Sequence, residues 1–164
     1  MFHKTLEEAC AGDQMGILTK GVKKTDINRG MAVVKPGSMS QHDVFEGQIY
    51  LLSKEEGGRG DPITNNMSKT IFSKTWDNTG HLSLDGDKKM IMPGEDGKVT
   101  VKLFKPMVLE AGQQFTVRQG NFTVATGKIT KALPNMTPDE RAYLTMSKKK
   151  REKMDAAKAA EQNK

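Results

Sequence analysis

The stretch that decides the fold is KVTVKLF, residues 98–104, in which apolar and polar side chains alternate. Successive side chains of an extended strand point to opposite faces, so the apolar residues of this stretch share one face and the polar residues the other. The apolar face carries Val99, Val101 and Leu103, and the polar face carries Lys98, Thr100 and Lys102. This alternation is typical of a half-buried β-strand.

The same period of two recurs through the middle of the chain. In VFEGQIYLLS, residues 44–53, it puts Phe45, Gly47, Ile49 and Leu51 on one face. Further candidate strands are TIFSKTW (70–76), HLSL (81–84), QFTVRQ (114–119) and FTVATGKITKAL (122–133). The turn signals between the strands are Asn78-Thr79-Gly80, Asp85-Gly86, Pro93-Gly94, Ala111-Gly112 and Gln119-Gly120-Asn121. Short strands at this spacing, with no long helix between them, predict an all-β fold, an antiparallel β-barrel or sandwich.

The first 34 residues carry weaker signals. FHKTLEEAC, residues 2–10, allows one or two helical turns. The apolar segments QMGILTKGV (14–22) and MAVV (31–34) predict two strands joined by a turn. Two strands are too few to form a sheet of their own, so the core domain is assigned to residues 35–133.

The character of the sequence changes at Pro134. Thr137, Pro138 and Glu140 form a capping box, which predicts the start of a helix. Residues 134–164 are therefore predicted to be a basic helical extension. Its densest positive charge lies at Lys148, Lys149, Lys150, Arg151 and Lys153. Two interpretations stay open: a solvated helix, or a basic arm that binds nucleic acid.

The composition limits the classes of protein that the chain can represent. Hydrophobic residues make up 35% and aromatics 5%, so the core must rest on aliphatic residues and methionine. The larger fillers are expected to be Phe45, Phe72, Phe104, Phe115 and Phe122. A net charge of +6 suits a phosphate-bearing partner. Cys10 is the single cysteine, which favours a reducing interior, and no apolar run approaches the roughly 20 residues of a membrane span, so we expect no membrane partner.

Catalytic and metal-binding patterns are incomplete. PGEDGK (93–98) and ATGKIT (125–130) contain Gly-Lys, but Met92 and Phe122 stand where a P-loop requires its first glycine. The histidines, His3, His42 and His81, lack the spacing of a zinc site and are expected at the surface. We therefore expect no catalytic centre, no metal and no cofactor in this chain.

Several ordered motifs together resemble one known family. They are VKPGS (34–38), LSKEEGGR (52–59), MPGEDGKV (92–99) and PMVLEAGQQFTVRQG (106–120). These segments are similar to the C-terminal domain of elongation factor Tu, particularly its animal mitochondrial form, and residues 2–30 look like the end of that family's second domain. The resemblance implies that residues 1–34 are a remnant of the second β-barrel and that residues 35–133 form the third-domain barrel.

The resemblance also implies a binding surface for the T arm of aminoacyl-tRNA. The matching positions are Arg59, Lys74, Thr79, Lys105, Arg118, Gln119 and Gly120. Arg and Lys neutralise phosphates, Thr donates to them, and Gly lets the backbone approach the ribose. The basic residues of the extension are expected to add phosphate contacts. This interpretation makes Arg59-Gly60-Asp61 part of a tRNA-binding loop instead of a cell-adhesion signal.

Two positions and one stretch depart from the family pattern. Gly60 replaces the usual histidine of the arginine loop, and Gln119 replaces the usual glutamate. NNMSKTIFSKTWD, residues 65–77, lacks the usual Arg-Pro-Gln before its strand.

The family's complete members bind GTP and Mg²⁺ and deliver aminoacyl-tRNA to the ribosome, but the motifs of that GTPase domain are absent from these 164 residues. The implied function is tRNA binding in the mitochondrial matrix by the C-terminal portion of such a factor. The favoured account is a fragment of a longer protein, and a stand-alone RNA-binding or regulatory protein is the alternative. A different class of function, a module that binds elongation factor Ts or another protein without tRNA, also stays open.

Overall fold

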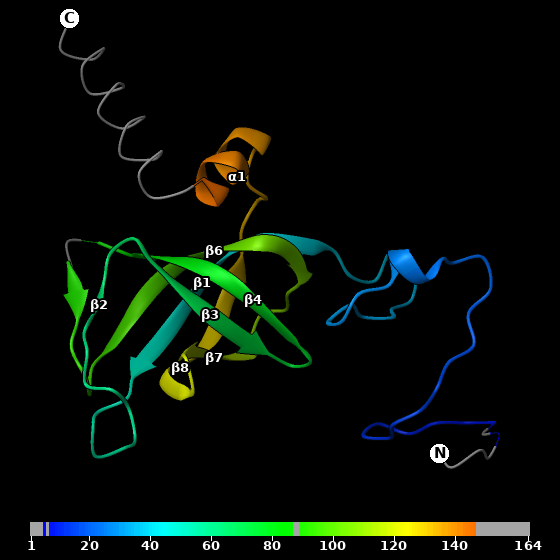
Figure 1. Cartoon of the computed structure of the whole chain (residues 1–164), viewed down its shortest axis with the longest axis horizontal. Helices are drawn as coiled ribbons and strands as arrows, with labels where there is room; N and C mark the ends of the chain where they lie inside the picture. The colour runs from blue at the N-terminus through cyan, green and yellow to red at the C-terminus, as the bar shows by residue number, and fades with distance from the viewer. Residues whose placement is uncertain (1–4, 6, 87–88, 147–164) are drawn as a thin grey trace, which may run out of the picture.

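The computed structural model describes residues 5, 7–86 and 89–146, and six of its strands close into one antiparallel barrel (Figure 1). The order around the barrel is β1, β6, β4, β3, β7, β8. The barrel strands are β1 (Gln41–Leu51), β3 (Met67–Ser73), β4 (Trp76–Leu84), β6 (Asp96–Val108), β7 (Gln114–Gln119) and β8 (Phe122–Ala132). A separate two-stranded sheet pairs β2 (Ile63–Thr64) with β5 (Met90–Ile91). The predicted all-β fold is confirmed, and it is a barrel.

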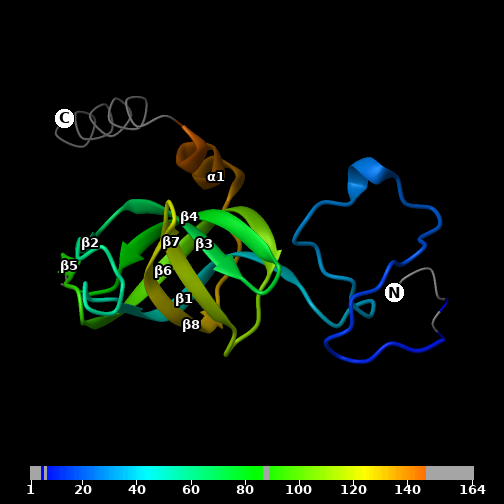
Figure 2. The same cartoon turned by 60° about the horizontal axis from the view of Figure 1, so that its bottom comes forward.

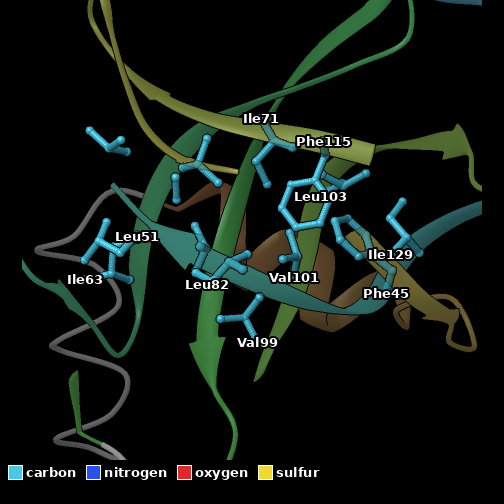
Figure 3. Close-up of a cluster of buried hydrophobic side chains, with 14 of the residues drawn as sticks. Phe45, Leu51, Ile63, Ile71, Leu82, Val99, Val101, Leu103, Phe115 and Ile129 are labelled. Atoms are coloured by element: carbon cyan, nitrogen blue, oxygen red, sulfur yellow. The ribbon is translucent and has the colours of Figure 1, made fainter. Parts of the chain in front are cut away.

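The core fills the inside of the barrel, as the alternating stretches predict. Val99, Val101 and Leu103 of β6 are buried, while the residues between them are partly exposed. Aliphatic side chains from β1, β3, β4, β7 and β8 converge on them (Figure 3). Two aromatic rings anchor the cluster: Phe45 and Phe115 meet edge to face, with centroids 5.3 Å apart.

The other three phenylalanines lie outside the barrel core. Phe72 and Phe104 are only partly buried because they lie on the outer face of their strands, next to the inward-facing Ile71 and Leu103. Phe122 is exposed at the start of β8, directly after the turn that joins it to β7. The expectation that all five phenylalanines fill the core was therefore wrong for Phe72 and Phe122, whereas Phe104 packs against a smaller hydrophobic cluster outside the barrel.

Asn78-Thr79-Gly80 is not a turn but the middle of β4. The hairpin turn lies earlier, at Lys74–Thr75, where Lys74 adopts a left-handed φ of 47°. Gly80 is required here for packing, since a Cβ at this position would lie 2.4 Å from Cδ1 of Ile71. A glycine can therefore occur inside a strand because a side chain would not fit there, and the sequence pattern then resembles a turn.

Residues 14–22 and 31–34 do not form the two predicted strands. A strand is held by hydrogen bonds to a neighbouring strand, and within the described residues no ladder includes either segment. One short 3₁₀ helix, η1 (Lys24–Asp26), lies between them. The segment runs out from the barrel (Figure 1), and of residues 2–10 only 5 and 7–10 are described, without a helix.

The N-terminal segment contacts the barrel near the start of β4. A Cβ on Gly30 would lie 2.6 Å from Cβ of Trp76, so this glycine packs directly against the indole-bearing residue. Arg29 and Asp77 approach to 3.8 Å beside it. The segment thereby contacts the single tryptophan at its Cβ, and the tryptophan itself is buried as part of the barrel core.

The predicted capping box is confirmed at the start of α1 (Pro138–Thr145). The Thr137 hydroxyl accepts from the Glu140 amide at 3.3 Å, and the Glu140 carboxylate accepts from the Thr137 amide at 3.0 Å. Leu144 of α1 and Met136 pack with Val44 of β1 in a second, smaller hydrophobic cluster. The helix therefore lies against the β1–β6 side of the barrel (Figure 1).

A buried carboxylate fastens this helix to the barrel. Asp43 of β1 is fully buried, accepts from the Met136 amide at 2.9 Å and pairs with the guanidinium of Arg141.

The predicted basic cluster of the extension, Lys148, Lys149, Lys150, Arg151 and Lys153, lies outside the described residues. No helix among the described residues is long and apolar enough to cross a membrane.

Candidate nucleic-acid interface

A row of polar side chains crosses the outer face of three neighbouring strands. Thr70 of β3 is in register with Thr79 of β4 on one side and with Arg118 of β7 on the other. All three are partly exposed, and the residues next to them, such as Ile71 and Val117, point into the core. Directly paired side chains on one face lie about 5 Å apart, so the row presents one positive charge and two hydroxyls together. Figure 2 shows β7, β3 and β4 side by side.

Arg118 is held in place by its neighbours. Its guanidinium lies over the ring of Phe72, 5.3 Å from the centroid, and Nη2 donates to the carbonyl of Asn121 at 3.1 Å. Nε is buried, and no hydrogen-bond partner is recorded for it in the described part of the chain. A cation that is fixed by stacking loses less side-chain entropy when it binds a phosphate.

The β7–β8 turn borders this row. Gly120 adopts a left-handed φ of 61°, and nothing lies within 4 Å of the position that its Cβ would occupy. The turn backbone is thus open to a ligand. The last residue of β7, Gln119, accepts a hydrogen bond from the ammonium of Lys69.

The loop that carries Arg59 is organised by one carboxylate. Glu56 accepts from the Ser53 amide at 2.9 Å and from the Tyr50 hydroxyl at 3.0 Å. The Ser53 amide and then the Tyr50 hydroxyl hold the pKa of Glu56 below its ordinary value, and the same bond to Glu56 raises the pKa of Tyr50. Gly58 is needed because a Cβ there would lie 2.4 Å from the Leu52 carbonyl oxygen.

The guanidinium of Arg59 lies close enough to Lys69, at the end of the barrel, to influence the pKa of that lysine. Its Nε is 3.3 Å from Asp61, so two of the three residues of the Arg-Gly-Asp tripeptide pair with each other. Burial lowers the pKa of Lys69, the charge of Arg59 lowers it further, and Asp61 raises it. Asp61, Lys69 and Gln119 also line a shared pocket of about 180 Å³.

Two of the predicted contact residues, Lys74 and Lys105, lie outside the cross-strand row of Thr79, Thr70 and Arg118. Lys74 is in the β3–β4 turn, at the opposite end of β3 from Lys69, and pairs with Glu110. Lys105 is exposed on β6, where its carbonyl accepts from Asn78 at 2.8 Å. The structure therefore brings Arg118 and Thr79 together across β3, with Gln119 and Gly120 next to Arg118 in the chain. Lys105 lies against Asn78, the neighbour of Thr79, and Lys74 lies in the β3–β4 turn.

Two residues of this region were not predicted from the sequence. Thr70 lies between Thr79 of β4 and Arg118 of β7 in the row. Lys69 donates a hydrogen bond to Gln119, which is 50 positions away in the sequence. A local pattern cannot reveal either, because the register between β3 and β7 is set by the closed barrel. The alternation in TIFSKTW indicates the facing of Thr70 but not its partners.

One histidine also differs from expectation. His81 is buried at the centre of β4, and its Nδ1 lies 3.2 Å from the Ser68 hydroxyl, so it is not a surface residue. Among the residues that the structure describes, no three His, Cys, Asp or Glu side chains are grouped closely enough to hold a metal ion.

Comparison with known proteins assigns the barrel. The family model of the elongation factor Tu C-terminal domain matches residues 38–133, which include every strand of the structure from β1 to β8. The match spans more than half of the chain. The chain therefore belongs to the elongation factor Tu C-terminal domain family, and its barrel is a translation elongation factor domain.

Proposed function

We propose that this chain is the tRNA-binding portion of a mitochondrial elongation factor Tu and that it receives the T arm of aminoacyl-tRNA on its β7–β3–β4 face. In the complete factor, a GTPase domain with GTP and Mg²⁺ would act together with this barrel to bring the tRNA to the ribosome. The observation that carries the proposal is the cross-strand row of Arg118, Thr70 and Thr79, with Arg59 and the open Gly120 turn at its margin.

The chemistry of this face fits an RNA backbone. Arg118 supplies a fixed charge for a phosphate, and the two threonine hydroxyls supply donors and acceptors for phosphate or 2′-hydroxyl groups. These groups position a backbone and do not require base-specific contacts. The membership in an elongation factor family supports tRNA as the ligand.

The test is binding of an aminoacyl-tRNA to the full chain, measured by filter retention at several salt concentrations. Arg118→Gln should weaken binding and reduce the slope of log K against log salt by about one, because one phosphate contact is lost. The matched control is Lys98→Gln, which removes one exposed charge from β6, and it should change both values much less.

The outcome that contradicts the proposal is equal binding by Arg118→Gln and Lys98→Gln. A thermal unfolding curve for each variant shows whether Arg118→Gln has lost the barrel, since Arg118 also stacks on Phe72.

A protein-binding function is the second candidate, and the exposed apolar residues of the N-terminal segment favour it. Ile17, Leu18 and Val33 expose more than half of their surface. Large exposed apolar residues in a group are typical of protein interfaces. Retention of elongation factor Ts by the full chain, together with no retention of aminoacyl-tRNA, would support this candidate over RNA binding.

A further inference from the structure

We propose that Lys69 is an additional phosphate-binding residue at the margin of the RNA-binding face and that Gln119 positions it. This inference rests on the RNA-binding function proposed above. It assigns a role to a residue that lies next to Thr70 in β3, and it specifies the ligand group as a phosphodiester of the bound RNA.

The bond between Lys69 and Gln119 carries the inference. Nζ of Lys69 donates to Oε1 of Gln119, which places the ammonium at the last residue of β7, directly before the Gly120 turn. Because Lys69 and Gln119 alternate with Thr70 and Arg118 along their strands, they border the outer face from the end of the barrel, where both line the pocket with Asp61. An amide oxygen orients an ammonium without neutralising it, whereas a carboxylate at position 119 would cancel its charge. An ammonium has three N–H donors, and this bond uses one.

The other charges around Lys69 leave the site positive. Arg59 and Asp61 are the charged groups close enough to change its pKa, and they pair with each other at 3.3 Å. Counting Lys69, Arg59 and Asp61 gives a net charge of one positive unit, and Arg118 next to Gln119 adds another. The region is therefore attractive to an anion even with Asp61 included.

Partial burial makes an anionic ligand favourable here. Burial and the charge of Arg59 both lower the pKa of Lys69, which means that its charged form is incompletely compensated in the free protein. A phosphate beside the ammonium would supply that compensation. A pocket of about 180 Å³ next to Lys69 leaves space beside the ammonium for a ligand.

The experiment compares Lys69→Met with Lys131→Met in the full chain. Lys131 is an exposed lysine on β8, two strands from β3 in the barrel, in register with Glu46 of β1 and at the end of β8 away from the β7–β8 turn. With aminoacyl-tRNA as the probe, Lys69→Met should lower the salt slope by about one and weaken binding roughly five- to tenfold at about 0.1 M salt. Lys69→Arg should restore most of the slope, because it retains the charge.

A second measurement needs no variant. Lysine acetylation of the wild-type chain, quantified by mass spectrometry with and without aminoacyl-tRNA, should show protection of Lys69 and little protection of Lys131. This readout separates direct contact from a loss of folding in Lys69→Met.

The outcomes distinguish the two proposals. The role of Lys69 is overturned if the wild-type chain binds tRNA, Lys69→Met has the same salt slope as the wild type, and tRNA does not protect Lys69 from acetylation. RNA binding by the chain would still stand. No detectable binding of tRNA by the wild-type chain rejects the proposed function, and the role of Lys69 with it.

Discussion

At the scale of single residues, the buried carboxylate of Asp43 has the largest predicted effect on stability. It accepts from the Met136 amide and pairs with Arg141, and each bond is lost in Asp43→Ala. A buried amide without a partner and a broken ion pair together cost about 2–4 kcal/mol. Urea unfolding of Asp43→Ala should show this loss.

The control is Asp139→Ala, which removes an exposed carboxylate from the first turn of α1. A surface change of this kind costs about 0.5 kcal/mol or less. If both alanine variants unfold at the same urea concentration, Asp43 does not fasten α1 to the barrel in the way described.

Gly127 packs against Phe115, one of the two phenylalanine rings in the barrel core. A Cβ at this position would lie 2.7 Å from the Gln48 carbonyl oxygen and 2.7 Å from Cζ of Phe115. Because the carbonyl belongs to the neighbouring strand, it cannot move aside as a flexible side chain would. Gly127→Ala should therefore destabilise the barrel by about 1–3 kcal/mol, measured by urea unfolding.

Gly16→Ala is the matched control for this change. Nothing lies within 4 Å of a Cβ at Gly16, so the added methyl group meets open space. Equal stabilities of the two alanine variants would mean that the β1–β8 contact at Gly127 has room that the structure does not show.

At the scale of secondary-structure elements, alternation is what makes the barrel predictable. KVTVKLF and VFEGQIYLLS are half-buried strands whose facing depends on local order alone, so β6 and β1 follow from the sequence. Thr79 shows the limit of local signals. It stands in a stretch that reads as a turn, yet Gly80 beside it is selected by its contact with Ile71 across the β3–β4 pair.

The candidate site was predictable in part. Strand facing and turn chemistry account for the outward position of Arg118 and for the Gly120 turn, but the choice of these residues, and of Arg59 and Gln119, comes from the family resemblance. The proximity of Lys69 to Gln119 depends on closure of the barrel between β3 and β7, which no local window contains. The strands predicted at 14–22 and 31–34 fail because strand formation requires a partner and not apolar residues alone.

The N-terminus of α1 makes stability depend on pH. The Thr137 amide, and then the ammonium of Lys102 at 3.2 Å, hold the pKa of Glu140 below its ordinary value of 4.5. A carboxyl group with a lowered pKa in the folded state stabilises it fully above 4.5, and this stabilisation is lost as the pH falls through the lowered value. The loss on acidification should therefore be smaller in Glu140→Gln than in the wild type.

The measurement is the midpoint of thermal unfolding for both proteins between about pH 7 and pH 3, the range in which the lowered pKa of Glu140 affects stability. The two curves should converge as the pH falls. Parallel curves over this range would show that Glu140 binds its proton equally in the folded and unfolded chain.

The C-terminal extension has two parts with different expected effects. Residues 136–146 hold α1 and the Asp43 pair, so their removal cuts into a packed cluster. Deleting residues 147–164 removes the basic cluster at 148–153 and keeps residues 136–146 in the chain. This deletion should lower the salt slope of tRNA binding while the unfolding midpoint stays nearly constant; an unchanged slope would contradict a role of the cluster in binding RNA.

At the scale of the whole molecule, the barrel and the N-terminal segment contribute unequally to stability. The segment exposes most of its large apolar side chains, and its described contact with the barrel is centred on Gly30, Arg29 and the start of β4. Little apolar area is buried there, so little stability depends on it. We expect the chain without residues 1–34 to fold cooperatively, with a loss of less than about 2 kcal/mol.

Trp76 reports on this contact because it is the single tryptophan of the chain, and Gly30 packs on its Cβ. Removing residues 1–34 should shift the fluorescence emission of Trp76 to the red, since water gains access to the indole. Gly30→Ala tests the same contact in the full chain: the φ of Gly30 is 89°, and the added methyl group would meet Trp76 at 2.6 Å. A red shift in both proteins, with the barrel still folded, would show that the contact at Gly30 shields the indole from water. An unshifted spectrum in both would mean that the indole is buried by the barrel strands themselves.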